Sequence, residues 1–243
     1  FKGIREGVTK QEQKELPQGT NYLRDVFDDI VDLVRSNRDF RRFVLVRSLL
    51  LASALSPTFL VTMANQQSVT EESSLASAIF TGLGTFVIAS GVASLLAGRI
   101  SGLLSDVSSR NTLSGAALLA TIVLIITVAL GYASSLSDAH AWTTALVWWL
   151  PIAFFIISLA HAAIRVARST YIVDMAEGTQ RTRYVSVANT LMGVLLLIVG
   201  ALTSVLALVS PEVALAALAL FGLLGAALSK TLPEVSVGKN KIS

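Results

Sequence analysis

The chain has 243 residues, of which 53% are hydrophobic and only 14% are charged, whereas soluble domains carry about 25% charged residues. With a mean hydropathy of +0.68, this composition excludes an ordinary water-soluble globule and leaves an all-α, polytopic membrane protein as the expected class. The net charge of +3 does not indicate nucleic-acid binding, because the basic residues stand beside apolar runs and not in one solvated domain.

The first part of the chain, 1–42, is polar and is predicted to be a linker with an amphipathic helix. Apolar residues recur at helical spacing from Leu23 to Val34, and aspartates share the opposite face. Two interpretations are equally supported: the helix packs within its own domain, or it lies against the membrane-embedded part.

The first apolar run, 43–64, carries two interruptions. Arg47 lies one turn inside the run, and we expect its side chain to extend to the cytoplasmic surface. Pro57 lies mid-run and removes a backbone hydrogen bond, which predicts a kink or a broken helix near Ser53 and Ser56. The polar stretch 65–74 is predicted to be the first outer loop.

Two further runs, 75–98 and 112–131, are long enough to cross a hydrocarbon core of about 30 Å at about 1.5 Å per residue. The polar stretch between them, 98–111, is predicted to be a loop. Within it, the spacing Gly98-x-x-x-Gly102 would let a neighbouring backbone approach closely. The run 112–131 is almost purely Leu, Ile, Val and Ala, so we expect it to face lipid.

The fourth run, 143–163, contains two tryptophans and a histidine. Trp148 and Trp149 lie about two turns inside it, so either an interfacial belt or a cavity wall fits them. His161 is expected to be packed or interfacial rather than a proton relay. Residues 164–183 are predicted to form the second inner loop.

The fifth and sixth runs, 184–209 and 213–229, are joined by a tight turn at Ser210-Pro211-Glu212. All 19 Lys and Arg lie in the N-terminal segment, the two inner loops, the C-terminal tail or the adjoining ends of the runs. This clustering predicts six crossings with both termini in the cytoplasm. The predicted domains are the linker 1–42, a six-helix transmembrane domain 43–230 and a cytoplasmic tail 231–243.

One polar stretch contains Gly102, Asp106 and Arg110, and another contains Arg168, Tyr171, Asp174 and Arg181. These two stretches resemble the signature loops of the major facilitator superfamily of secondary transporters. The residues of the first stand in the family's order, although Val107, Ser109 and Asn111 depart from its pattern. The residues of the second also follow the family's order. Because the resemblance covers the whole chain, it implies the C-terminal half of a twelve-helix major facilitator fold, whose partner is a missing N-terminal six-helix half.

The resemblance also implies a conformational gate at the inner side. An aspartate at a helix end can pair with a nearby arginine or with the N-terminal amides of the helix beginning near Tyr184. Such contacts would form in one state and break in the other. The alternative is a loop that only retains positive charge inside. The predicted gate residues are Gly102, Asp106, Arg110, Arg168, Asp174 and Arg181.

By the same resemblance, the first, second, fourth and fifth spans would line a solute cavity. An aromatic and hydroxyl wall suits a small or amphipathic organic solute that moves by alternating access. The spans hold few ionisable groups. If transport is coupled to a proton or another ion, we expect the residues that bind it to lie in the missing half. The cavity candidates are Ser56, Thr58, Thr62, Thr85, Trp148, Trp149, Asn189 and Thr190.

Other classes of protein find less support. The chain has no cysteine, so it offers no disulfide and no thiolate metal site. It has neither a His-Glu-x-x-His nor a Gly-x-Ser-Gly motif, and we expect no enzymatic activity, metal or cofactor. The expected location is a lipid bilayer, the bacterial inner membrane. The alternative function is that of a complete six-helix protein acting as a homodimeric carrier or scaffold.

Overall fold

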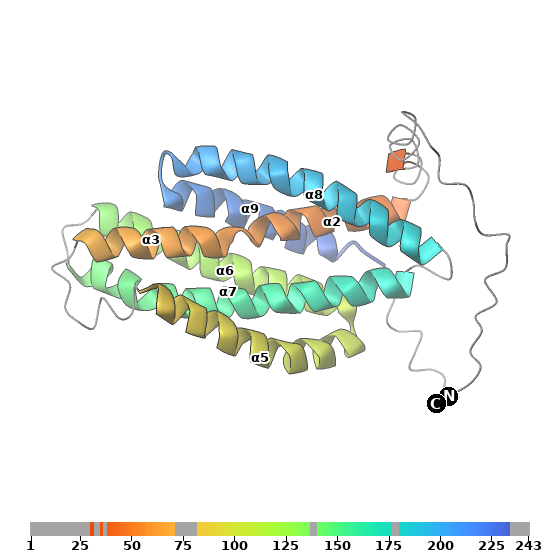
Figure 1. The fold of residues 1–243 in the computed structure, drawn as a ribbon, viewed down its shortest axis with the longest axis horizontal. Helices are drawn as coiled ribbons and strands as arrows, with labels where there is room; N and C mark the ends of the chain where they lie inside the picture. Colours follow the sequence, from red (N-terminus) through yellow and green to blue (C-terminus); the bar gives the residue numbers. More distant parts are fainter. Residues whose placement is uncertain are drawn as a thin grey trace, which may run out of the picture. The chain divides into compact units, whose positions relative to one another are not determined.

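The computed structural model describes residues 30–31, 35, 38–70, 82–136, 140–175 and 180–233. The described backbone is helical apart from short turns, which confirms the all-α class. Most of the predicted amphipathic helix lies outside the described residues. The chain divides into two compact units, 1–41 and 42–243. The helices (Figure 1) are α2 (Arg38–Ser53), α3 (Ser56–Thr70), α5 (Leu83–Val107), α6 (Ser109–Leu136), α7 (His140–Met175), α8 (Gln180–Ala207) and α9 (Pro211–Ser229).

Within the described part of the chain, six stretches are long and apolar enough to cross a membrane, as predicted. The α2 and α3 helices together form the first of these stretches, and each of the other helices provides one. The stretches are Arg38–Gln67, Leu83–Leu104, Ser109–Leu136, Ala141–Tyr171, Val185–Ala207 and Pro211–Ser229.

The first span is a broken helix, in which α2 and α3 follow one another end to end (Figure 1). Pro57, the second residue of α3, has no N–H to donate to the carbonyl of Ser53. The N–H groups of Ala54 and Leu55 instead donate to carbonyls three residues earlier, each at 3.1 Å. The break predicted from Pro57 is therefore confirmed, and it lies between Ser53 and Ser56.

The polar stretch 98–111 is not the loop that its composition predicts. The α5 helix continues to Val107 and α6 begins at Ser109, so Ser108 alone is non-helical. Its hydroxyl accepts a hydrogen bond from the N–H of Asn111 at 3.1 Å, and the residue acts as the N-cap of α6.

The other predicted loops are shortened in the same way, because residues 65–70 and 164–175 are helical. An apolar run marks only the part of a helix that suits hydrocarbon. The backbone hydrogen bonds continue into the polar sequence beyond it, and this is why those boundaries were wrong.

The α6 helix is central and does not simply face lipid, contrary to the prediction. It packs against both α7 and α9. By contrast, only 17% of the apolar window of α5 and 11% of that of α8 are buried. The Leu, Ile, Val and Ala content of α6 was misleading because small and hydroxyl residues mark the packed side of a membrane helix. These include the buried Ser109, Thr112, Ser114, Ala117, Ala120, Thr121, Thr127 and Gly131.

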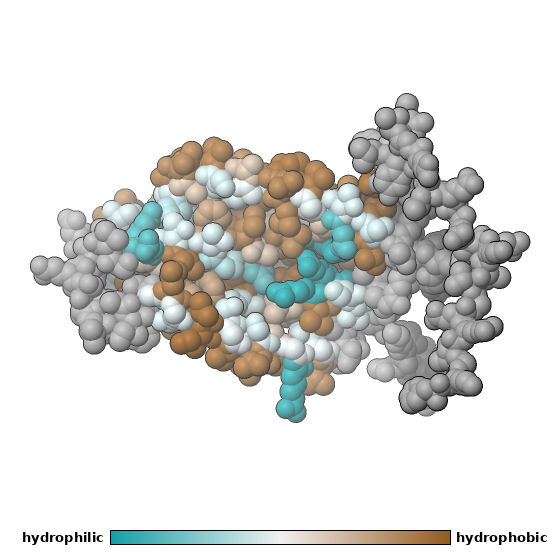
Figure 2. All heavy atoms as spheres, viewed as in Figure 1, coloured by the Kyte–Doolittle hydropathy of each residue, from teal (hydrophilic) through white to brown (hydrophobic). Residues whose placement is uncertain are grey.

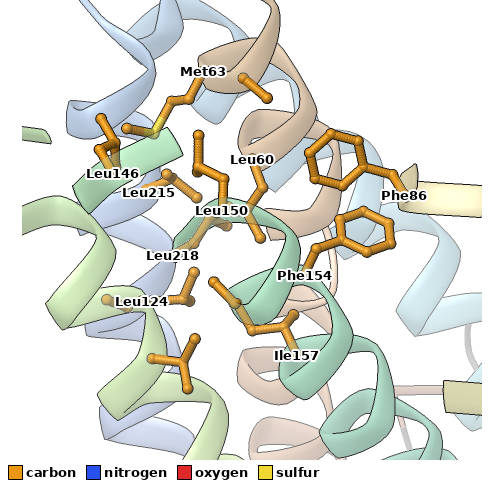
Figure 3. Close-up of a cluster of buried hydrophobic side chains, with 14 residues drawn as sticks. Leu60, Met63, Phe86, Leu124, Leu146, Leu150, Phe154, Ile157, Leu215 and Leu218 are labelled. Atoms are coloured by element: carbon orange, nitrogen blue, oxygen red, sulfur yellow. The ribbon is translucent and has the colours of Figure 1, made fainter. Parts of the chain in front are cut away.

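The core joins α3, α6, α7 and α9, with α5 at its margin (Figure 3). Phe86 of α5 meets Phe154 of α7 edge to face, with ring centroids 5.0 Å apart. Lipid tails are as apolar as these side chains, so close packing stabilises this arrangement more than exclusion of water does. The core residues labelled in Figure 3 are Leu60, Met63, Phe86, Leu124, Leu146, Leu150, Phe154, Ile157, Leu215 and Leu218.

Close helix approach occurs at the glycines of α9 and not at Gly98-x-x-x-Gly102. A Cβ atom on Gly222 would stand 2.6 Å from Oγ1 of Thr121, and one on Gly225 would crowd Leu50 of α2 in the same way. A Cβ atom on Gly98 or Gly102 would have no described neighbour within 4 Å. The predicted close approach at α5 is therefore absent from the described part of the chain.

Candidate functional site

Hydrophilic side chains gather on one face of the second unit, where α2, α7 and α8 run. Figure 2, viewed as in Figure 1, shows a hydrophilic patch there within a largely hydrophobic surface. We call the following residues the arginine cluster: Arg47 of α2, His161, Arg165 and Arg168 of α7, and Asn189 of α8. The cluster lies in the half of the unit nearer the end of α7.

Arg47 joins α2 to α8. Its Nη2 donates a hydrogen bond of 2.7 Å to Oδ1 of Asn189, which lies 142 residues away in the sequence. Its Cζ lies 6.0 Å from the ring centroid of Phe43, at the limit of a cation–π contact. Nε of Arg47 is buried and has no hydrogen-bond partner among the described residues. The sequence did not indicate the hydrogen bond to Asn189, which joins the guanidinium group to a neighbouring helix.

An aromatic pair supports the cluster from the packed side of α2. The rings of Phe43 and Tyr171 are stacked, with centroids 5.2 Å apart and an interplanar angle of 10°. The hydroxyl group of the fully buried Tyr171 donates to the carbonyl of Pro233 at 2.9 Å. This pair fixes the start of α2 against α7, and it ties the segment after α9 to the same place.

The arginines of the cluster repel one another. The charge of the half-buried Arg168 interacts unfavourably with those of Arg47 and Arg165. Among the described residues, no acidic side chain forms an ion pair with Arg47 or Arg168. An uncompensated positive charge in a membrane span is costly, so this part of the structure provides cations without their counter-charge.

His161 lies buried beside the arginines, as the sequence predicted for a packed histidine, with Nε2 3.4 Å from Oγ of Ser53. The Ser53 hydroxyl group already donates to the carbonyl of Leu50 at 2.7 Å, so in this contact the serine oxygen is the acceptor and Nε2–H the donor. Nδ1 of His161 is buried, and no residue in the described part of the chain forms a hydrogen bond with it.

Of the cavity candidates, Asn189 belongs to the arginine cluster and the others lie elsewhere. Thr190 is exposed on α8, and Thr58, Thr62 and Trp148 are exposed on α3 and α7. Thr85 is half-buried on α5. Ser56 is fully buried, and its hydroxyl oxygen has no hydrogen-bond partner within the described ranges. The Thr62 hydroxyl group donates to the Thr58 carbonyl at 3.0 Å.

Trp149 is half-buried, and its indole N–H donates to Oγ1 of Thr127 on α6 at 2.9 Å. Replacing Thr127 with valine removes that acceptor with almost no change of shape. We expect a loss of about 1–3 kcal/mol of stability, because the indole N–H is left without a partner. Thermal unfolding of the purified protein measures the loss.

Thr203→Val is the matched control for this prediction, because the Thr203 hydroxyl group is bonded to the carbonyls of Val199 and Gly200 in its own helix. Equal shifts for Thr127→Val and Thr203→Val would contradict the prediction.

The predicted gate residues lie near the junctions of α5 with α6 and of α7 with α8. Asp106 is in the last turn of α5, Asp174 is near the end of α7 and Arg181 is near the start of α8. The side chains of these three lie outside the described residues. Nη1 of Arg110 donates to the carbonyl of Leu232 at 3.3 Å.

Two cavities lie apart from the predicted cavity residues. The larger is about 450 Å³ and lies among α5, α6 and α7, with Leu104, Leu119 and Leu159 in its apolar wall. The second is about 370 Å³ and is lined in part by Arg110 and Lys230. None of the eight cavity candidates lines either of them.

Sequence reasoning had singled out Arg47, Asn189, Tyr171 and His161, but separately. Their pairing depends on contacts between distant parts of the chain, and nothing in the local pattern marks it. The sequence feature that best indicated the arginine cluster was Arg47, an arginine inside an apolar run.

The comparisons with known proteins agree with the fold. A family model described as Major Facilitator Superfamily matches residues 41–242. Curated proteins and solved structures give no match. The matched region contains the spanning helices and both signature stretches that resemble this family. The chain is an integral membrane protein, and it belongs to the major facilitator superfamily of membrane transport proteins.

Proposed function

We propose that this chain is one six-helix half of a transporter that moves a small organic solute across a membrane by alternating access. The observation that carries the proposal is the polar face on three helices that are otherwise apolar. Arginine and asparagine in a membrane span face water or protein and not hydrocarbon. A face that bears Arg47, Arg168 and Asn189 is therefore suited to line a solute path.

The open glycines of α5 and α8 support a second six-helix unit across that path. On α5, Gly84, Gly91 and Gly98 have no described neighbour within 4 Å, and their spacing places them opposite the buried Ala93. On α8, the open Gly193 lies one turn from Asn189. Small residues let a neighbouring backbone approach closely. We take the other half of a twelve-helix protein as the occupant, and a second copy of this chain as the alternative.

The orientation follows from the charges. Lys and Arg gather near the start of α2, at the junctions α5–α6 and α7–α8 and after α9, and such clustering marks the cytoplasmic side. The arginine cluster then occupies the cytoplasmic half of the path, and the break between α2 and α3 lies deeper in the membrane.

The gate hypothesis predicts the effect of Asp106→Asn. Loss of a carboxylate at the cytoplasmic end of α5 should weaken the closed cytoplasmic gate and favour the inward-open state. A charged thiol reagent can label Gly193→Cys from the cytoplasmic side or from the outer side. We expect Asp106→Asn to raise the ratio of the cytoplasmic to the outer labelling rate by about threefold or more. Inside-out and right-side-out vesicles provide the two measurements.

Glu212→Gln is the control, because it removes a carboxylate at the opposite end of the unit, in the first turn of α9. If Gly193→Cys reacts from one side only, both with and without Asp106→Asn, that result would contradict alternating access at this position.

A further inference from the structure

We infer that the solute is an anion, bound through a carboxylate or phosphate group by Arg47 and Arg168. The inference rests on the proposed transport function, because it takes the polar face to be a solute path. It goes further by assigning the chemical class of the solute and the residues that select it.

The first step is that neither Arg47 nor Arg168 has a counter-charge among the described residues. Arg47 makes its hydrogen bond to a neutral amide, that of Asn189, and its buried Nε has no partner. Arg168 has neither an ion pair nor a hydrogen bond among the described residues. Two neighbouring cations in a membrane span repel one another and are poorly solvated. An anion between them would remove both penalties.

The second step is the geometry of the donors. A guanidinium group presents planar, parallel N–H donors that match the two oxygens of a carboxylate or phosphate. One nitrogen of the Arg47 guanidinium group, Nη2, donates a hydrogen bond of 2.7 Å to Asn189. The ring of Phe43 lies beside the guanidinium group. The group is thus oriented in advance, which lowers the entropy lost on binding. Because Nε is buried, the remaining Nη N–H groups are the ones available to a solute.

The third step is the neighbouring histidine. Nδ1 of His161 is buried without a partner, while Nε2 is directed to Ser53. The charges of Arg165 and Arg168 act on the same ring. A neutral imidazole in this position offers an acceptor for a hydroxyl group of the solute, next to the cations that would hold its anionic group.

The test measures arginine reactivity in the protein placed in phosphatidylcholine nanodiscs. Phenylglyoxal modifies accessible guanidinium groups, and peptide mass spectrometry reads each arginine separately. The probes are inorganic phosphate, citrate and benzoate, with benzamide as the neutral analogue of benzoate, at constant ionic strength in chloride buffer. Arg99, exposed on α5, is the internal control.

We expect at least one anion to slow the modification of Arg47 and Arg168 by about tenfold or more, while benzamide does not and Arg99 is unaffected. The same anion should raise the unfolding temperature of the wild type and of Arg99→Gln but not of Arg47→Gln or Arg168→Gln. Absence of protection by all three anions would overturn the inference and would assign the counter-charge to the protein itself. Protection that requires phosphatidylglycerol in the nanodisc would assign the site to a lipid headgroup and would overturn the solute assignment.

Uptake into proteoliposomes separates this inference from the proposed function. Protection by an anion that is not taken up would leave the anion site standing and contradict transport of that anion through the site. Uptake of neutral solutes without protection by any anion would leave transport standing and overturn the anion assignment.

Discussion

Gly222→Leu is expected to lower the stability of the protein by about 3 kcal/mol or more, because overpacking at a close helix contact forces backbone shifts. A Cβ atom at this position would stand 2.6 Å from Oγ1 of Thr121 and 3.6 Å from Cβ of Ser53. Thr121 cannot easily rotate away, since its hydroxyl group is bonded to the carbonyl of Ala117 at 2.8 Å. The leucine would therefore separate α9 from α6.

Gly115→Leu is the matched control, since Gly115 lies on α6 with no described neighbour within 4 Å of its Cβ position. There the substitution should change the stability by less than about 1 kcal/mol, or increase it through the higher helix propensity of leucine. Thermal unfolding of both variants in the same detergent provides the comparison. Equal losses of stability would show that the contact between α9 and α6 is looser than the structure indicates.

The features that sequence predicted well are those determined by local chemistry. Each of the six apolar runs is long enough to cross the hydrocarbon core as a helix, so the runs predict six spanning helices. Pro57 marks the break in the first span because a missing N–H acts at its own position. The tight turn predicted at Ser210-Pro211-Glu212 is present, and there the Ser210 hydroxyl group accepts the N–H of Val213 at 3.3 Å.

The features that sequence predicted badly depend on distant contacts. The glycines of Gly98-x-x-x-Gly102 looked like a packing motif, yet the close contacts are made by Gly222 and Gly225. Glycine spacing alone does not identify the packed pair, because the position of a neighbouring helix decides which glycines are in close contact. The same holds for Arg47, whose partner Asn189 could not be identified without the fold.

The central claim is that the face bearing Arg47 and Asn189 is a water-accessible path and is not covered by lipid. Gly193 and Ile198 of α8 test it as a matched pair. Gly193 lies one turn from Asn189 on the same side, whereas Ile198 is about 140° further around the helix. Both lie near the middle of Val185–Ala207, the spanning part of α8, and Ile198 is 59% exposed.

The most direct measurement is the reaction of Gly193→Cys and Ile198→Cys with a charged, membrane-impermeant methanethiosulfonate in the protein in membranes. The chain has no cysteine of its own, so each introduced thiol is the only one in this segment. We predict that Gly193→Cys reacts about tenfold faster than Ile198→Cys or more, because only a thiol in contact with water forms the reactive thiolate. Equally slow reaction of both thiols would mean that lipid or protein covers this face, and it would contradict the proposed path.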